Sequence, residues 1–453
     1  MLDIAFIRNN PDVIKEGIRK KRMKADIDEL LEVDDKCREL RAEAERLRAD
    51  RNRLSRSVSV SRSGPKSGSV SGSRSEATTK KIKELLFDDD ENRVEQVKKI
   101  KIRLTELDPQ LKEAERKFED LMLLVPNPPL PEVPDGESDD DNVEVRSFGA
   151  PRNFDFPVKD HLELAESLDI LDMQRAVKIS GARMYCLKSE GAMLEFALFR
   201  FVLDHLVSKG FIPFVVPQLV RREAMIGTGF FPLGEEDTFA IEKDQLFLIG
   251  TSEVPLVSYH MDEILSEKEL PKHYCGYSSC FRREAGSYGR DTRGFYRLHQ
   301  FNKVEQVVIC VNDPEVSRKE HDLILGNSEE IMQALGLPHR VALACGAEIG
   351  QGQVLKHEIE TWMPSRGKYS ETHSCSSLHE FQARRCRIRW RGKDKKTQYC
   401  HTLNNTAAAS PRILIPILEN FQEADGSVTI PEVLRSYMNG IERIEPKESR
   451  SKK

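Results

Sequence analysis

Two long runs of apolar residues, spaced alternately by three and four positions, constrain the fold of this chain most strongly. The first run contains Leu30, Val33, Cys37, Leu40, Ala44, Leu47 and Leu54, with Arg51 where an apolar residue is due. The second contains Val97, Ile100, Leu104, Leu107, Leu111, Ala114, Phe118 and Leu121. This spacing predicts coiled-coil helices, and the polar break between the runs favours an antiparallel hairpin. Because a helix of about 40 residues is about 60 Å long, we expect the hairpin to project from the rest of the protein.

The break between the two runs, at about residues 55–79, is rich in Ser, Gly, Val and Arg. It has too little apolar surface to order itself, so we expect a Ser-rich tip without regular structure. Basic residues gather around it, among them Arg48, Arg51, Arg53 and Arg56. A basic run is usually a solvated helix face, and paired heptads are also typical of an oligomerisation coil. Clustering at the end of a long hairpin instead favours contact with a phosphate backbone.

The segment Cys280–Glu305 concentrates the chemically useful side chains. Two aromatic and apolar runs flank a glycine-containing loop at residues 285–294, which predicts a β-hairpin. Strand alternation places Arg282 and Glu284 on one face of the first arm, and it places Arg297, His299, Phe301, Lys303 and Glu305 on one face of the second. The plain alternative is a solvated hairpin face. An aromatic ring among charges favours a cradle for a polyanion with a flat ring, because arginines neutralise phosphate and Phe301 offers a stacking surface.

Composition narrows the class of protein. The 453 residues predict two domains, and 32% charged against 39% hydrophobic residues is too polar for a membrane protein. Nine cysteines without a C-x-x-C pair indicate reduced thiols in a cytosol. The histidines form none of the patterns that are typical of a zinc site, so no zinc is expected. Any ATP site works without a P-loop, since G-x-x-x-x-G-K-[ST] is missing. The net charge of −5 argues only weakly against nucleic acid, because acidic runs mask basic patches.

Residues 281–284, Arg297 and Phe301 resemble motif 2 of the class II aminoacyl-tRNA synthetases, and residues 299–305 are similar to the seryl-tRNA synthetase version. The resemblance extends over nearly the whole chain. It implies an α+β fold, in which an antiparallel sheet with flanking helices is joined to an N-terminal antiparallel α-helical coiled-coil arm. It also implies a cytoplasmic homodimer, with motif 1 at residues 194–217 in the dimer interface. Such an enzyme activates L-serine with ATP and charges tRNA(Ser), with tRNA(Sec) left open as a second partner.

The resemblance assigns ATP to residues from motifs 2 and 3 and from a polar stretch between them, namely Arg282, Glu284, Arg297, Leu298, Phe301, Glu371, Ser374 and Arg412. Arg282 and Arg412 are implied as the catalytic cations. Phe301 is implied to stack on adenine, with the Leu298 backbone reading the edge of the base. Glu371 and Ser374 are implied to hold Mg²⁺, since hard cations take oxygen ligands. Residues 381–389, which follow, are expected to form a basic strand.

Ser410 and Pro411 predict the N-cap and first position of a helix that begins before Arg412. The helix dipole disfavours a cation in the first turn, so an arginine there favours an anion outside the helix. Pro416 is then an unexplained irregularity within that helix.

The resemblance assigns L-serine to Thr251, Glu253, Glu305, Asn404 and Thr406. Glu305 is expected to pair with the substrate ammonium. A plain helix cap with an acidic first turn is the alternative for Thr251 and Glu253. The sequence Asn-Asn-Thr-Ala at residues 404–407 departs from the commoner Asn-Gly-Ser-Gly form, and it resembles a bacterial subgroup in which threonine lines the serine site.

A proline-rich stretch followed by an acidic one separates the expected domains. We expect a tRNA-binding helical domain at 1–125, a linker at 126–142, a catalytic domain at 143–445 and a disordered basic tail at 446–453. Two rivals remain. A ligase that loads serine onto a carrier protein or small molecule would need no tRNA arm. A degenerate scaffold would have no need to keep Glu253, Arg282, Glu305, Glu371 and Arg412 together.

Overall fold

The computed structural model describes residues 1–62, 76–285 and 294–450, with side chains described for all of these except 56–62, 76–91 and 450. The chain divides into two compact units, residues 25–124 and residues 1–24 together with 125–453. The expected N-terminal domain, 1–125, therefore differs from the smaller unit, because its first 24 residues group with the larger one. Within the expected disordered tail, Lys447–Arg450 form helix α14, and residues 451–453 lie outside the described part of the chain.

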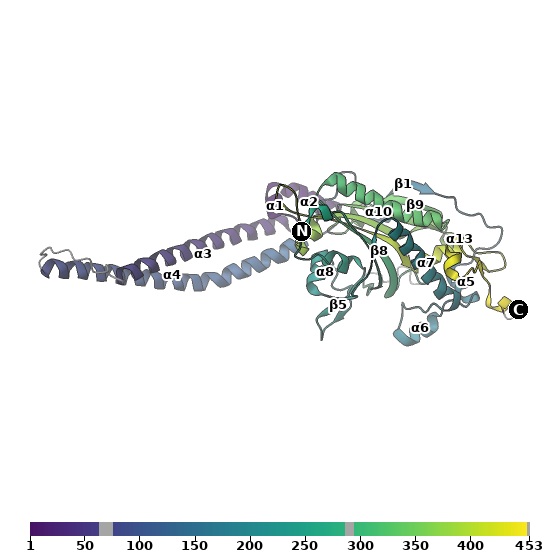
Figure 1. Ribbon diagram of the computed structural model, residues 1–453, viewed down its shortest axis with the longest axis horizontal. Coiled ribbons are helices and arrows are strands. Elements are labelled where there is room, and N and C mark those ends of the chain that lie inside the picture. Colours follow the sequence, from purple (N-terminus) through teal and green to yellow (C-terminus); the bar gives the residue numbers. More distant parts are fainter. Residues whose placement is uncertain (63–75, 286–293, 451–453) are drawn as a thin grey trace. The chain divides into compact units, whose positions relative to one another are not determined.

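The smaller unit is a pair of antiparallel helices, α3 (Ile27–Arg62) and α4 (Glu76–Leu124), which run side by side (Figure 1). Leu40, Ala44 and Leu47 of α3 pack with Ile100, Leu104, Leu107 and Leu111 of α4, and Val33 and Cys37 pack with Ala114, Phe118 and Leu121. Ion pairs flank this seam, including Arg41–Glu115 at 2.7 Å and Arg103–Glu43 at 2.8 Å. The helical hairpin predicted from the heptads is confirmed.

The helices extend further than the sequence indicates. The break predicted at 55–79 is wrong at both ends, since α3 continues to Arg62 and α4 begins at Glu76; residues 63–75 lie outside the described residues. Once a helix is nucleated, each added residue gains a hydrogen bond, so Ser, Val and Arg are tolerated within it. Helix α4 also continues through Pro109.

The described residues of the larger unit form an eight-stranded sheet in the order β1-β9-β10-β11-β14-β8-β7-β2. Its strands are β1 (Val143–Phe148), β2 (Ile212–Val215), β7 (Lys272–Phe281), β8 (Gln300–Cys310), β9 (His339–Leu343), β10 (Leu355–Met363), β11 (Lys368–His379) and β14 (His401–Ser410). Neighbours are antiparallel except for β2, which pairs in parallel with β7. The antiparallel sheet expected for the catalytic domain is confirmed.

Helices and small sheets surround this sheet. The helices are α1 (Ile4–Asn9), α2 (Pro11–Lys20), α5 (His161–Ser167), α6 (Met173–Ser180), α7 (Ser189–Ser208), α8 (Arg222–Thr228), α9 (Glu253–Ser258), α10 (Pro314–Ala334), α11 (Phe381–Cys386), α12 (Leu414–Asn420) and α13 (Glu432–Arg435). The remaining strands are β3 (Leu219–Arg221), β4 (Ala240–Ile241), β5 (Leu246–Leu248), β6 (Ile264–Ser266), β12 (Arg389–Arg391), β13 (Thr397–Tyr399), β15 (Val428–Thr429) and β16 (Arg443–Ile444). Among the described helices, none is long and apolar enough to cross a membrane.

The alternation of side chains along β8 separates a packed face from a polar one. Helices α7 and α10 pack on the sheet, and Figure 1 shows both near its central strands. Val304 and Val308 belong to the main hydrophobic core, and Gln306 Nε2 donates to the Ile324 carbonyl of α10 at 3.1 Å. Side chains alternate in a strand, so Lys303 and Glu305 lie on the opposite face. Only the part of that face around Lys303 and Glu305 is polar, because Val307 and Ile309 on the same face pack in a second hydrophobic cluster.

Residues 1–24 fold with the larger unit because Lys21 is almost fully buried in it. Its ammonium donates to the carbonyls of Gly350, Gln351 and Gln353 at 2.9, 3.0 and 2.5 Å. Asn127, at the other end of the hairpin, holds the same loop, since its backbone N donates to Gln351 O and its side chain to Gly352 O, each at 3.0 Å. The two chain segments that lead into the helical hairpin are therefore anchored on one loop.

Candidate active site

A pocket lies on the polar face of the sheet, where β8, β11 and β14 run next to one another. Its lining includes Arg282, Glu284, Tyr296, Arg297, Leu298, Phe301, Lys303, Glu371, Thr372, His373, Ser374, Thr406, Ala409, Ser410, Pro411 and Arg412. All the residues assigned to ATP from the sequence belong to this lining. The fold therefore gathers side chains that are up to 130 positions apart in the chain.

The predicted β-hairpin is present, but its paired strands are shorter than the alternation indicated. Strand β7 ends at Phe281 and β8 begins at Gln300, so Arg282, Glu284, Arg297 and His299 lie beyond the strands. The prediction that strand alternation places these four side chains on common faces is therefore wrong. Arg282 N donates to His299 O at 3.0 Å, and the Glu284 carboxylate accepts from Arg297 at 3.4 Å. These contacts, rather than strand pleating, shape the wall of the pocket.

Asp237 holds the chain at residues 283–285, directly after strand β7. Its carbonyl accepts from Arg283 N at 2.9 Å, and its carboxylate accepts from Ala285 N at 3.0 Å. Nearby, the Arg282 guanidinium lies 5.2 Å from the centre of the Phe301 ring. A cation and an aromatic face therefore meet on one side of the pocket, the combination expected from the sequence for a nucleotide.

Arg412 lies before a helix and not in its first turn. Strand β14 extends to Ser410, the chain turns at 411–413, and α12 begins at Leu414, so the predicted helix start at Ser410 and Pro411 is wrong. Buried alanines at 407–409 prolong the strand within the sheet, and this packing overrides the local capping signal. Pro416 then falls in the first turn of α12, where a missing N–H costs nothing.

The Arg412 guanidinium lies between an acid and an aromatic ring. It donates to Glu371 Oε2 at 3.0 Å, and its centre lies 4.5 Å from the centre of the Tyr296 ring. Burial favours the neutral form of Arg412, but Tyr296 and Glu371 outweigh it and raise the pKa. Arg412 is thus a fixed cation on the pocket wall.

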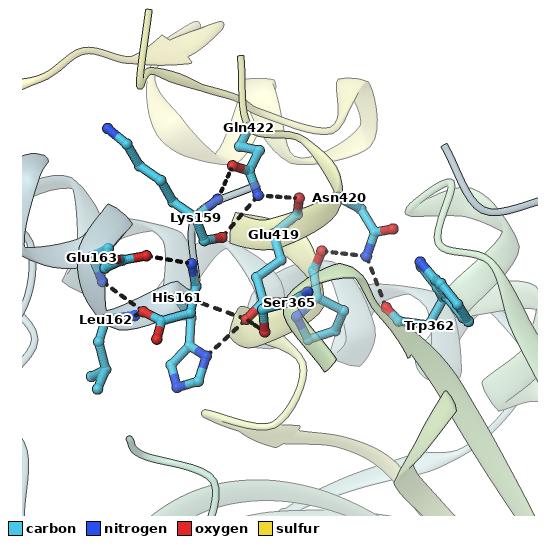
Figure 2. Close-up of polar contacts among 11 residues, drawn as sticks. Lys159, His161, Leu162, Glu163, Trp362, Ser365, Glu419, Asn420 and Gln422 are labelled. Atoms are coloured by element: carbon cyan, nitrogen blue, oxygen red, sulfur yellow. Dashed lines mark hydrogen bonds and ion pairs between the residues drawn. The ribbon is translucent and has the colours of Figure 1, made fainter. Parts of the chain in front are cut away.

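A polar network around the buried Glu419 of α12, the helix that follows Arg412, is shown in Figure 2. Glu419 of α12 accepts from His161 N and Nδ1 at 3.1 and 2.8 Å, and from Ser365 N and Oγ at 3.0 and 2.9 Å. The His161 ring meets the Phe295 ring edge-on at 4.9 Å, next to Tyr296 in the chain. The carboxylate therefore ties the helix after Arg412 to the segment that carries its aromatic neighbour.

Glu371 and Ser374 belong to strand β11, not to a loop. A register shift opposite Ile359 and Glu360 of β10 allows consecutive residues 371–374 to line the pocket. Burial acts to raise the pKa of Glu371, but Arg412 and Lys356 outweigh it and lower the pKa.

The expected basic strand at 381–389 is wrong, because residues 381–386 form α11. A short amphipathic turn cannot be told from a strand by its charges alone.

Two oxygen-bearing side chains on β11 fit a hard cation. Glu371 offers an ionised carboxylate, Ser374 offers a hydroxyl, and Glu358 lies opposite Ser374 in the strand pairing. Burial raises the pKa of Glu358 to about 7, although Lys356 lies 2.5 Å away and opposes this shift. Within residues 1–62, 76–285 and 294–450, no group of three or more His, Cys, Asp or Glu side chains is arranged to hold a metal.

The residues assigned to serine form a buried polar group next to the pocket, and one of them, Thr406, belongs to its lining. Asn404 Nδ2 donates to Glu253 Oε1 at 2.9 Å, Thr251 Oγ1 accepts from Glu253 N at 3.3 Å, and Thr406 lies opposite Glu305 in the pairing of β14 with β8. Burial and the charge of Glu305 raise the pKa of Glu253 to about 7. Ser252 occupies the N-cap position of α9 but donates to Gly276 O, so Thr251 alone supports the capping alternative.

Three neighbours of these residues received no role from the sequence, although Lys303 was expected on the same face as Glu305. Tyr296 donates from its hydroxyl to Glu371 O at 2.6 Å, and Lys303 lies 2.5 Å from Glu305. An aromatic residue beside Arg297 and a lysine on the face of Glu305 are signals that could reveal these two. Gln382 donates to Glu253 Oε1 at 2.6 Å across 129 positions, and no local pattern marks it.

The arginines assigned to tRNA lie on the helical hairpin. Arg48 pairs with Asp108 of α4 at 2.9 Å, Arg53 pairs with Asp50 at 2.9 Å, and Arg51 donates to Asn52 Oδ1 at 3.4 Å. The side chain of Arg56 lies outside the described ones. Exposed ion pairs contribute about 0–1 kcal/mol, so a phosphate can replace the acidic partner at little cost. Their role in binding tRNA stays a prediction.

Comparison with known families agrees with this geometry. Residues 238–421 match the model of the tRNA synthetase class II core domain (G, H, P, S and T), and residues 1–68 match that of the seryl-tRNA synthetase N-terminal domain. The sheet and its pocket are therefore those of the class II aminoacyl-tRNA synthetase core.

Full-length relatives narrow the class further. The serine–tRNA ligase of Deinococcus radiodurans is 44% identical over 98% of each chain, and that of Thermodesulfovibrio yellowstonii is 41% identical over 98% of this chain and 100% of the relative. The crystal structure of seryl-tRNA synthetase from Pyrococcus horikoshii complexed with ATP is 36% identical, with a TM-score of 0.84 over 98% of this chain and 100% of that one. The chain belongs to the serine–tRNA ligase family.

Arg412→Ala is expected to slow adenylate formation by about 10²–10³-fold, because it removes a preorganised cation from the wall of the pocket. Thermal unfolding should change little, since the ion pair with Glu371 is partly exposed. Pyrophosphate exchange and a melting curve check both results. Arg412→Lys, which keeps the charge but loses the planar fork, should be intermediate. A variant that is clearly less stable yet fully active would show that Arg412 is structural.

Proposed function

We infer that this protein is a serine–tRNA ligase, which activates L-serine with ATP and transfers the seryl group to tRNA(Ser). One observation carries the choice of site: the residues assigned to ATP line a single pocket, and the buried group of Glu253, Asn404 and Glu305 adjoins it through Thr406 and Lys303, which belong to the lining. An anionic nucleotide and a small polar amino acid need such adjoining subsites. Family membership over the full length supports the same activity.

In the first step, the serine carboxylate attacks the α-phosphorus of ATP. A new bond forms between the carboxylate oxygen and this phosphorus, the bond to the oxygen bridging the β-phosphate breaks, and pyrophosphate leaves. No general base is required, because the carboxylate is ionised at neutral pH. Arg282 and Arg412 contribute positioning and neutralisation of the charge that builds on the phosphate oxygens. Phe301 offers its face to adenine and Leu298 offers its backbone to the edge of the base. Glu284 and Arg297 form the adjoining wall.

Glu371 and Ser374 are the residues that would hold Mg²⁺ with ATP. Their oxygens suit a hard cation, and the lowered pKa of Glu371 keeps its carboxylate ionised. Bound Mg²⁺ would neutralise part of the triphosphate charge. Lys303 and Glu305 bind and orient serine, with Glu305 facing its ammonium, while Thr251 and Thr406 offer hydroxyls to its small polar groups.

In the second step, a ribose hydroxyl of the terminal adenosine of tRNA attacks the carbonyl carbon of seryl-adenylate. The new ester bond forms, the bond to the adenylate oxygen breaks, and AMP leaves. The helical hairpin at 25–124, with Arg48, Arg51, Arg53 and Arg56, contacts the tRNA backbone, and the segment 126–142, which folds with the larger unit, continues the chain into the catalytic part at 143–445. The same surface would also bind tRNA(Sec) if this tRNA presents its backbone to the helical hairpin as tRNA(Ser) does.

We propose that the enzyme is a homodimer that acts in the cytoplasm. Exposed apolar side chains on α7 and β2 support a dimer, because Phe196, Ile212 and Val215 are 65%, 53% and 91% exposed. Strand β2 also ends the sheet, which leaves its outer edge open to a second copy.

Pyrophosphate exchange measured with each amino acid in turn tests this function. We expect exchange with serine alone, followed by esterification of tRNA(Ser) when total tRNA is added. Exchange with serine but without charging of any tRNA would favour a ligase that acts on a carrier. The absence of exchange with all amino acids would favour a scaffold.

A further inference from the structure

Gln382 is a buried glutamine whose side-chain amide is oriented at both ends. Only 1% exposed, it lies on α11, which packs against α8, α9 and β14. Its Nε2 donates to Glu253 Oε1 at 2.6 Å and to Thr228 O at 3.0 Å. Its Oε1 accepts from Thr402 Oγ1 at 2.7 Å. Because both the donor and the acceptor end are engaged, the amide has one orientation.

Glu253 receives both of its amide donors on one oxygen. Gln382 and Asn404 donate to Oε1 from α11 and from β14, at 2.6 and 2.9 Å. A carboxylate oxygen has two lone-pair directions, so these donors fill Oε1. A substrate group that reaches Glu253 therefore meets Oε2.

We propose that Gln382 is a positioning residue for the recognition of serine, which it supports by fixing the Glu253 carboxylate with Oε2 turned to the substrate hydroxyl. This inference rests on the proposed function and names a residue through which serine is selected. A hydroxyl is what distinguishes serine from alanine. A site built to bond a hydroxyl discriminates strongly against an analogue without it, because its buried acceptor is then left unpaired.

The charges around Glu253 make the contribution of Gln382 measurable. Burial and Glu305 favour the protonated form of Glu253, whereas the Gln382 hydrogen bond, Lys303 and Arg282 favour the ionised form. The resulting pKa is about 7. Loss of the Gln382 donor removes one of the groups that stabilise the carboxylate, so the pKa rises further. At neutral pH a larger fraction of Glu253 is then protonated and cannot accept from the hydroxyl.

The test is serine-dependent pyrophosphate exchange between pH 6 and pH 9 in the full chain and in Gln382→Met, which keeps the volume but loses the amide. We expect the KM for serine to rise about 10–100-fold at pH 7, because that factor corresponds to the loss of one charge-assisted hydrogen bond. The KM for ATP should stay within about twofold of its value in the unaltered protein. The rising limb of kcat/KM for serine should move to higher pH. Discrimination against alanine should fall.

Gln422→Met is the matched control. Gln422 is equally buried at 1% exposed and bridges Lys159 N and O in the network around Glu419 (Figure 2). It should lower stability without moving the pH limb or the KM for serine. Thr402→Val is a second, gentler variant, because it keeps the shape of the side chain and removes only the donor that orients Gln382. It should raise the KM for serine in the same direction by a smaller factor.

The outcomes separate this inference from the proposed function. If the unaltered protein exchanges with serine but Gln382→Met and Thr402→Val leave its KM and pH profile unchanged, the inference is overturned and the function stands. Equal rises in the KM for serine and ATP, with an unmoved pH limb, assign Gln382 a structural role and also overturn it. No serine exchange in the unaltered protein overturns the proposed function, and the inference with it.

Discussion

Glu305→Ala is expected to abolish serine activation, with pyrophosphate exchange falling about 10²–10³-fold or more. Glu305 is 2% exposed and lies 2.5 Å from Lys303, in the buried group that includes Glu253. Removing one partner of a desolvated charge pair costs about 3–5 kcal/mol, and here the substrate ammonium loses its carboxylate. The stability of the free protein should also fall, because the buried Lys303 loses its ion-pair partner.

Isosteric replacement separates charge from shape at this position. Glu305→Gln retains the side-chain volume, so it should lose nearly as much exchange activity as Glu305→Ala if the ammonium pairs with the charge. Loss of the Glu305 charge should also lower the pKa of Glu253 from about 7, since that charge helps to raise it. The pH limb for serine would then move to lower pH in the residual activity of Glu305→Gln. Near-normal serine exchange in either variant contradicts the assignment.

Deletion of residues 27–124 is expected to leave serine activation intact and to reduce tRNA charging to near zero. Residues 25–124 form a compact unit of their own, and the segments that flank it are anchored on the loop at 350–353 by Lys21 and Asn127. A short linker should therefore rejoin them without unfolding the sheet. Charging should collapse because the hairpin supplies the contacts that hold the tRNA. Exchange kinetics and aminoacylation of tRNA(Ser), measured in parallel, check both halves.

Salt dependence shows whether the hairpin binds phosphate. Binding of tRNA by the intact protein should weaken steeply with salt, and every phosphate that the protein no longer neutralises should reduce the slope of log K against log salt by about 0.7–0.9. We therefore expect a shallower slope of log K against log salt when Arg48, Arg51, Arg53 and Arg56 are replaced by Ala. Arg116→Ala is the matched control, an exposed arginine paired with Glu113 at 2.7 Å on the same hairpin but far along the chain from the tip. Unchanged charging by the shortened protein would refute the role of the hairpin.

Local patterns in the sequence were enough for several parts of this protein. The three–four spacing of the apolar residues in the two runs that contain Leu40 and Leu104 predicts the helical hairpin, because a helix with such an apolar stripe must bury it. The loop between two aromatic runs predicts the pairing of β7 with β8. The resemblance of residues 281–284, Arg297 and Phe301 to motif 2 predicts one wall of the pocket, since these residues lie close together in the chain. In each case the signal comes from a local run of residues.

Tertiary structure alone decided the rest. Ser410 and Pro411 carry a good capping signal, yet the buried alanines before them extend β14, and Arg412 meets Glu371 and Tyr296 ahead of the helix. Residues 381–386 form a helix, which brings Gln382 to Glu253 across 129 positions. Periodicity reports only which face of an element is apolar. Which buried polar groups meet depends on how distant elements pack, and that is set by the burial and hydrogen bonding of the whole sheet rather than by any stretch of sequence.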